Sequence, residues 1–199
     1  MKVSTVLDRR SNDSAGRREA ILDAAEALMV EEGYAAVTSR RIGERAGQRS
    51  KLVHYYFATM DELFVALYER AERQYLERHR QAVNSASPLR ALWELSVHPQ
   101  RTRLSQEFIA LSQHRESIRR ITTRVLERMH TINTQFISTY LRESGIDPEE
   151  YPPIVISQII SSLSRSLVNE ESMGISPGHA EVHAFAERWL SRLENRHQR

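Results

Sequence analysis

Apolar residues recur at steps of three or four along most of the chain, which is the spacing of one face of an α-helix. The first such stripe holds Ile21, Leu22, Ala25 and Leu28, and Gly33 follows where a helix should end. Similar stripes predict helices over residues 17–32, 39–46, 50–56, 59–82, 88–96, 101–113, 115–143, 153–171 and 179–196. No segment has the alternating pattern of a strand. The sequence therefore predicts an all-α fold of about nine helices.

The second and third predicted helices are short and lie close together. Gly47 in the turn between them can adopt positive φ, so the pair predicts a helix-turn-helix. Thr38 is placed to cap the first of the two, and Thr59 with Glu62 forms a capping box that opens the long helix after them. These signals predict a helix-turn-helix domain at residues 15–58 and a larger helical body at 59–199. The polar start of the chain lacks periodicity, which predicts a flexible N-terminal arm at residues 1–14.

The third predicted helix has an outward face of unusual composition. With Val53 pointing inward and about 100° per residue, Lys51 and Tyr55 point outward, and His54 and Leu52 flank them. Cations, phenols and an aliphatic group suit the major groove, where they meet phosphates, guanine edges and thymine methyls. The predicted DNA-binding residues are Thr38, Arg40, Arg41, Gln48, Arg49, Ser50, Lys51, Leu52, His54 and Tyr55. The alternative is a tight helical corner, which explains the aromatic residues 56 and 57 but not this outward set.

Charge favours a polyanion partner for the same segment. The whole chain has 28 Lys and Arg against 26 Asp and Glu, yet residues 38–57 carry five cations and one carboxylate. Such a local patch predicts binding of a polyanion, although a solvated basic face would have the same composition. Cysteine is absent, which excludes disulfides and thiolate metal sites. No apolar run reaches the length of about 18 residues that a membrane span needs. We therefore expect a cytoplasmic protein without a membrane partner.

Two stretches resemble a known family. Residues 38–64, "TSRRIGERAGQRSKLVHYYFATMDELF", resemble the helix-turn-helix signature of the TetR family of transcriptional regulators, and residues 17–38, "RREAILDAAEALMVEEGYAAVT", are similar to its first helix. The resemblance covers residues 15–68. It implies an all-α homodimer, a palindromic double-stranded DNA operator, usually repression, and an unknown small-molecule effector bound in the body.

Four positions depart from the family's pattern. Gly43 stands where alanine is usual, and Lys51 stands where glycine is frequent. His54 replaces a tyrosine, and Met60 a lysine, that commonly contact phosphate in the family. We expect Tyr55 and Lys51 to supply the missing phosphate contacts.

The body carries polar and aromatic residues near its apolar stripes, as a ligand cavity would. The candidates for its lining are Trp93, His98, Phe108, His114, Asn133, Phe136 and Tyr140, with plain core packing as the alternative for each aromatic residue. No charge cluster in the body indicates the charge of a ligand. The last two predicted helices form the expected dimer surface through Ile156, Ile159, Leu163, Phe185, Trp189 and Leu190. The alternative for the helix at 153–171 is that it packs in the core of its own subunit and turns a polar face outward.

Enzyme motifs are missing from the sequence. His179 and His183 have the spacing of a zinc-protease helix, but Glu181 is about 200° around from His179 and so faces away. The sequence predicts no cofactor, no metal site and no catalytic residue. The leading hypothesis is a repressor released by a small molecule. An activator or an effector-independent DNA-binding protein is the alternative in that class, and a helical enzyme or interaction module is the alternative outside it.

Overall fold

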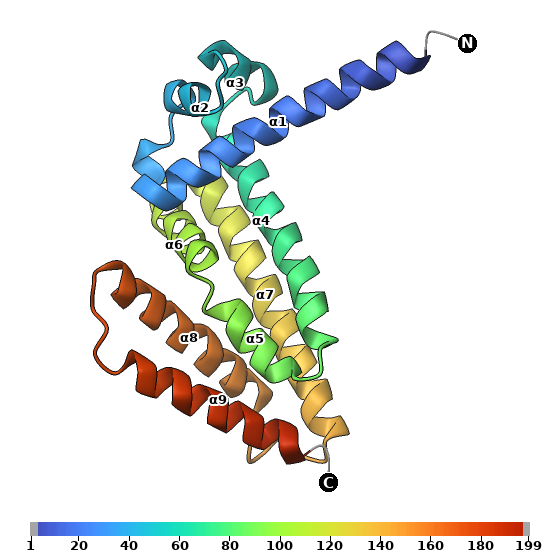
Figure 1. Ribbon diagram of the computed structural model, residues 1–199, viewed down its shortest axis with the longest axis vertical. Coiled ribbons are helices and arrows are strands. Elements are labelled where there is room, and N and C mark those ends of the chain that lie inside the picture. Colours follow the sequence, from blue (N-terminus) through green and yellow to red (C-terminus); the bar gives the residue numbers. More distant parts are fainter. Residues whose placement is uncertain (1–3, 197–199) are drawn as a thin grey trace. The chain divides into compact units, whose positions relative to one another are not determined.

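The computed structural model describes the backbone of residues 4–196 and the side chains of residues 14–195, and this part of the chain is helical apart from turns (Figure 1). Its elements are α1 (Ser4–Glu32), the short 3-10 helix η1 (Tyr34–Ala36), α2 (Ser39–Arg45), α3 (Ser50–Tyr56), α4 (Met60–Val83), α5 (Pro88–Ser96), α6 (Pro99–Ser112), α7 (Glu116–Glu143), α8 (Pro153–Ser172) and α9 (His179–Arg196). The predicted all-α fold is confirmed. Each predicted helix is present, and apart from the start of α1 the predicted ends lie within two residues of the observed ones.

α1 begins at Ser4, and the predicted start at residue 17 was therefore wrong. Residues 4–16 have no apolar stripe, so periodicity gave no reason to place a helix there. Extension of a helix that has already formed needs no second nucleation, because each added residue gains a backbone hydrogen bond. The flexibility of the 1–14 arm stays a prediction, and its first three residues lie outside the described part of the chain.

The chain folds into two compact units. The N-terminal unit contains the residues up to Arg70 together with Leu104–Thr122, and the C-terminal unit contains Ala71–Arg103 and the residues from Thr123 onward. The N-terminal unit is larger than the predicted DNA-binding domain of residues 15–58, because parts of α4, α6 and α7 belong to it. The rings of Tyr68 on α4 and Phe108 on α6 stack with 4.1 Å between their centroids. Asp61 on α4 accepts hydrogen bonds from Arg115 and Ser117 at the start of α7.

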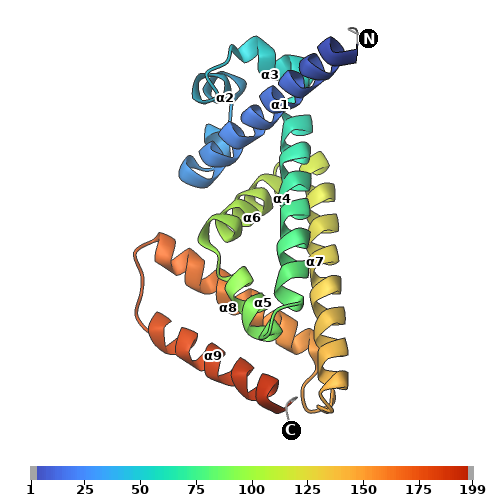
Figure 2. The same ribbon diagram turned by 45° about the vertical axis from the view of Figure 1, so that its right-hand side comes forward.

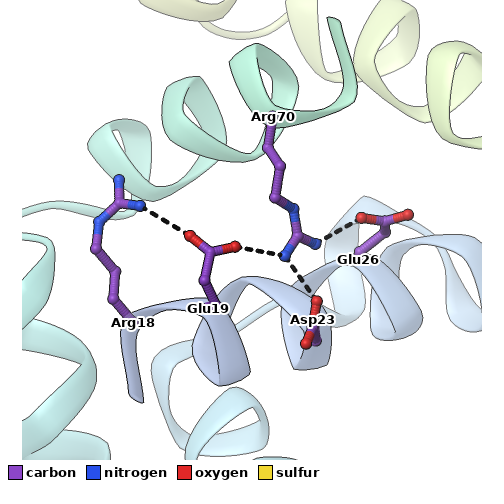
Figure 3. A network of polar contacts seen from close by, with 5 residues as sticks. All are labelled: Arg18, Glu19, Asp23, Glu26 and Arg70. Atoms are coloured by element: carbon purple, nitrogen blue, oxygen red, sulfur yellow. Dashed lines mark hydrogen bonds and ion pairs between the residues drawn. The ribbon is translucent and has the colours of Figure 1, made fainter. Parts of the chain in front are cut away.

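A buried arginine ties α4 to α1 inside the N-terminal unit. The Nη1 atom of Arg70 lies 2.7 Å from Asp23 and 3.3 Å from Glu19, and its Nη2 atom lies 2.6 Å from Glu26 (Figure 3). The three carboxylates project from one face of α1, because residues three and four apart are neighbours on a helix. Arg70 is 7% exposed, so its charge is placed in the interior with its counter-ions at the rim.

The C-terminal unit packs α5, α8 and α9 around one apolar core. Leu92 and Trp93 of α5, Ile156 of α8 and Leu190 of α9 are buried in it, and α8 and α9 lie side by side in both ribbon views (Figure 2). Glu194 is 8% exposed and accepts hydrogen bonds from the backbone N–H of Leu89 at 2.8 Å and of Arg90 at 3.2 Å. These N–H groups at the start of α5 have no partner within that helix, so α9 supplies its N-terminal cap.

Candidate nucleic-acid interface

Local caps and a tight turn fix the geometry of α2 and α3. Thr38 has an extended backbone and its side-chain oxygen accepts a hydrogen bond from the N–H of Arg41 at 3.3 Å, which confirms the predicted N-cap. Gly47 adopts a φ of 63°, as the turn between two helices requires. The N–H of Gln48 donates to the carbonyl of Gly43 at 2.8 Å. A Cβ atom at Gly43 would stand 2.9 Å from the carbonyl oxygen of Gln48, so the turn closes tightly on this glycine.

The inner face of α3 is fixed by α1. Val53 and Phe57 are buried, and the guanidinium carbon of Arg18 on α1 lies 5.0 Å from the centre of the Phe57 ring. The hydroxyl of Tyr56 lies 3.2 Å from the Ser14 hydroxyl, within hydrogen-bond distance. The rotation of α3 about its own axis is therefore set, and its opposite side must face outward.

The outward side of α3 carries the residues that the sequence placed there. Lys51 and His54 are exposed, Leu52 is half-buried, and Tyr55 is 77% exposed. The Tyr55 ring meets only the edge of the Tyr56 ring among the ring contacts of the described residues, with centroids 5.1 Å apart. An aromatic ring left in water on a rigid helix is typical of a surface that binds a partner.

Fewer cations on this surface are unpaired than the sequence indicated. Arg41 pairs with Glu32 at 2.5 Å, Arg45 with Glu31 at 2.6 Å, and Arg40 with Glu44 at 3.3 Å. The hydrogen bond from Arg41 lowers the pKa of Glu32 below its usual range. Two of these carboxylates end α1 and lie outside the basic segment, so a count over residues 38–57 missed them.

Two cations at the start of α3 are not paired with any carboxylate of the described residues. Within the described residues, no ion pair engages Arg49 or Lys51, and both side chains are exposed. Ser50 between them is exposed and Gln48 before them is half-buried. The free positive charge of the helix-turn-helix is therefore concentrated at the turn and the first residues of α3.

The comparison with known families agrees with this geometry. Residues 21–67, which run from α1 into α4, match the model of the bacterial regulatory proteins of the tetR family. The segment that runs from α1 into α4 therefore carries the pattern of the tetR family. No curated protein matches its sequence.

Solved structures match this chain over nearly its full length. A TetR transcription regulator from Haloarcula marismortui shares 17% identity with a TM-score of 0.69, covering 91% of this chain and 97% of its own. A transcriptional regulator from Rhodococcus sp. Rha1 shares 17% with a TM-score of 0.64, covering 91% and 94%. A protein from Saccharomonospora viridis, described as a transcriptional regulator and solved in complex with choline, shares 18% with a TM-score of 0.70, covering 91% and 95%. At these identities the likeness concerns the fold.

The candidate pocket residues do not gather in one place. Phe108 is fully buried in the N-terminal unit, where it packs on Tyr68 and Phe64. His114 is exposed beside an open hollow of about 510 Å³ in the same unit, which Met60 also lines. Both belong to the N-terminal unit because α6 turns its apolar face to the start of α4, so neither is a pocket candidate for the C-terminal unit.

The other candidates lie in the C-terminal unit. Trp93 is 2% exposed, and its ring meets that of His183 with centroids 5.6 Å apart, so it serves the core. Tyr140 packs beside Phe136. Asn133 accepts a hydrogen bond of 2.9 Å from the hydroxyl of Tyr75.

The predicted dimer residues separate into two groups. Ile156 and Leu190 are 2% and 0% exposed and belong to the core of the C-terminal unit, so we withdraw them from the predicted surface. Leu163 and Trp189 are partly buried against that core. Ile159 and Phe185 are 38% and 58% exposed. Both helices have apolar residues on two sides, and only the packing shows which side faces the core.

The described residues show neither a helix long and apolar enough to cross a membrane nor a group of three His, Cys, Asp or Glu side chains that would hold a metal. The two histidines of α9 have other contacts. His179 lies 2.9 Å from Glu170, and His183 packs on Trp93.

Proposed function

We propose that this chain is a TetR-family transcriptional regulator that binds duplex DNA with the outward face of α3 in the major groove. The observation that supports the proposal is the composition of that face. Lys51, His54 and Tyr55 are exposed on a helix whose inner side is fixed by α1, and Arg49 and Lys51 have no ion-pair partner within the described residues. Unpaired cations bind phosphate without first breaking an internal contact.

The paired arginines of α2 have a secondary role in this proposal. Exposed ion pairs contribute only about 0–1 kcal/mol, so Arg40 and Arg41 can exchange their glutamates for phosphates at little cost. Arg49 and Lys51 need no such exchange. We expect these two residues to carry most of the phosphate contact, with Tyr55 and His54 adding polar contacts.

We also propose a two-fold dimer on a palindromic operator. Two copies of α3 must then reach successive major grooves, which lie about 34–36 Å apart. The exposed apolar side chains of α8 and α9, Val155, Ile159 and Phe185, offer a surface for the second copy. We expect the partly buried Leu163 and Trp189 to border it.

The regulation that we propose is release from DNA by a small molecule bound in the C-terminal unit, which makes the protein a repressor acting in the cytoplasm. The choline complex of the Saccharomonospora viridis protein supports a ligand site in this fold. A ligand reverses a 99:1 preference for the DNA-binding state only if it binds the other state about 10⁴-fold more tightly. A constitutive DNA-binding protein would bind its operator equally well with and without ligand.

The test begins with selection of genomic fragments bound by the protein, followed by affinity measurements on the selected site. Lys51→Ala should weaken binding about tenfold, the equivalent of one charge-assisted contact of about 1.5 kcal/mol. If Lys51 contacts a phosphate, the salt slope should also fall by about 1. Arg120→Ala, an exposed α7 arginine of the same unit, is the matched control for loss of one positive charge. Unchanged affinity in a Lys51→Ala, Tyr55→Phe double variant would refute the docking of α3.

A further inference from the structure

The C-terminal unit contains a half-buried cation, Arg101, that forms no ion pair with a carboxylate of the described residues. The guanidinium of Arg101, in the first turn of α6, lies over the ring of Tyr75, with its central carbon 5.1 Å from the ring centre. Its Nη1 atom is buried and, among the described residues, has no hydrogen-bond partner. Burial and the nearby charge of Arg78 lower the pKa of Arg101 to about 10, against the opposing effect of Tyr75. The charged form is therefore poorly compensated in this structure.

A chain of polar contacts runs from Arg101 to α7. The Tyr75 hydroxyl donates to the side-chain oxygen of Asn133 at 2.9 Å. Burial lowers the pKa of the nearby His79, and the side chain of Asn133 opposes that shift. The His79 ring meets Phe136 edge-on, with centroids 6.2 Å apart. Polar groups thus line up beside an aromatic ring, which is the composition expected where a ligand has one polar and one apolar end.

Unsatisfied atoms stand at both ends of this chain of contacts. Nε2 of His79 and Nδ1 of His98 are buried without a hydrogen-bond partner within the described residues. The charges of Arg101 and Arg78 reach His98, where they add to burial in lowering its pKa. Buried polar groups in native proteins are nearly always paired, so several unpaired ones around one cation need an explanation.

Arg70 shows how the same chain treats a buried arginine that serves structure alone. Its guanidinium has three carboxylate partners, at 2.6, 2.7 and 3.3 Å. Arg101 has no carboxylate partner among the described residues, and no carboxylate contributes to its pKa. A buried cation is stable when an anion pairs with it. Since the described residues supply no anion at Arg101, an external one would complete the group.

We propose that Arg101, Tyr75, Asn133 and His79 form the polar end of a binding site for the carboxylate of a small organic anion, with Phe136 against its apolar part. A carboxylate fits because the planar guanidinium donates two parallel hydrogen bonds to it. The proposal rests on the proposed function, because it gives the effector of the C-terminal unit a chemical class. That class differs from the cation choline, which is bound by the Saccharomonospora viridis protein.

The experiment measures thermal stability of the full chain without DNA, in the presence of matched probes. These are benzoate, phenylacetate and hexanoate, their neutral amides, and inorganic phosphate, each at the same ionic strength. At least one carboxylate should raise the melting temperature by about 5 °C near saturation, while its amide raises it much less. Arg101→Met should abolish this rise. Since Arg101→Met also removes an uncompensated, partly buried charge, the ligand-free variant should melt about 2–4 °C above the wild type.

Several outcomes would overturn the proposal. They are no stabilisation by any of the carboxylates, equal stabilisation by acids and amides, stabilisation that survives in Arg101→Met, or a larger Arg101-dependent effect of phosphate than of every carboxylate. Asn133→Leu is the second variant if Arg101→Met fails to fold, and it should reduce the rise with the same probe. Because no DNA is present, failure here leaves the DNA-binding proposal standing. Failure of operator binding would not alter the carboxylate result.

Discussion

Replacement of Arg70 by methionine tests whether the carboxylates of α1 hold α4 in place. Methionine keeps most of the apolar stem and removes the guanidinium together with its contacts to Glu19, Asp23 and Glu26. The three carboxylates would then stand as like charges at neighbouring positions of one helix. We expect the N-terminal unit to lose stability, and the size of the loss follows from the exposure of each partner.

Breaking a buried ion pair typically costs about 3–5 kcal/mol, because one charge is left buried and alone. Here the side chains that remain are 51%, 73% and 32% exposed, so water hydrates their charges and reduces the loss. The Nε atom of Arg70 is also buried without a partner among the described residues, and methionine removes that cost. We therefore expect a net loss of about 1–2 kcal/mol, or about 2–8 °C in melting temperature for a chain of this size.

The assay is urea unfolding followed by circular dichroism, with Arg73→Met on the exposed side of α4 as the control. The control should stay within about 0.5 kcal/mol of the wild type. A variant that adds Glu19→Gln, Asp23→Asn and Glu26→Gln to Arg70→Met should recover part of the loss, because no like charges remain to repel. High salt should also narrow the gap between Arg70→Met and the wild type. Arg70→Met as stable as the control, or no recovery in the combined variant, would refute this reasoning.

Three further predictions concern single residues. Gly43→Ala should destabilise the protein by about 1–3 kcal/mol and weaken DNA binding, because the new methyl would stand 2.9 Å from a backbone oxygen. Gly16→Ala, with open space around it, should stabilise the protein by about 0.5–1 kcal/mol. Equal effects of the two variants in urea unfolding would contradict this prediction. Burial lowers the pKa of His79 in the folded state, so protonation favours unfolding and stability should fall as pH drops below the unfolded value of about 6.5. His79→Gln should reduce that slope between pH 7 and 5, and an unchanged slope would exclude His79 as a source. Glu194→Ala should lower the free energy of unfolding by about 1–3 kcal/mol, because two N–H groups at the start of α5 lose their buried acceptor. Glu194→Gln keeps an acceptor oxygen and should lower it less in the same assay.

The sequence by itself determined the helices and the rotation of α3. Both follow from rules that act within one or two turns of chain. Thr38 caps α2, and Thr59 with Glu62 opens α4, because each side chain reaches a backbone N–H only a few residues away. With Val53 buried, the period of the helix alone places Lys51 and Tyr55 on the outer side. The start of α1 could not be predicted in this way, because its polar first turns have no periodic pattern of apolar residues.

Only the tertiary structure decided which of these groups are free and which are paired or buried. Glu32 and Glu31 at the end of α1 pair with Arg41 and Arg45, and Glu44 pairs with Arg40. Among the described residues this leaves Arg49 and Lys51 as the cations of the predicted basic segment without an ion pair. Packing also places Leu190 in the core while Phe185 stays exposed. It sets the half-buried guanidinium of Arg101 over Tyr75 without a carboxylate partner among the described residues. Periodicity describes one helix at a time, whereas burial and charge pairing depend on residues brought together from distant parts of the chain.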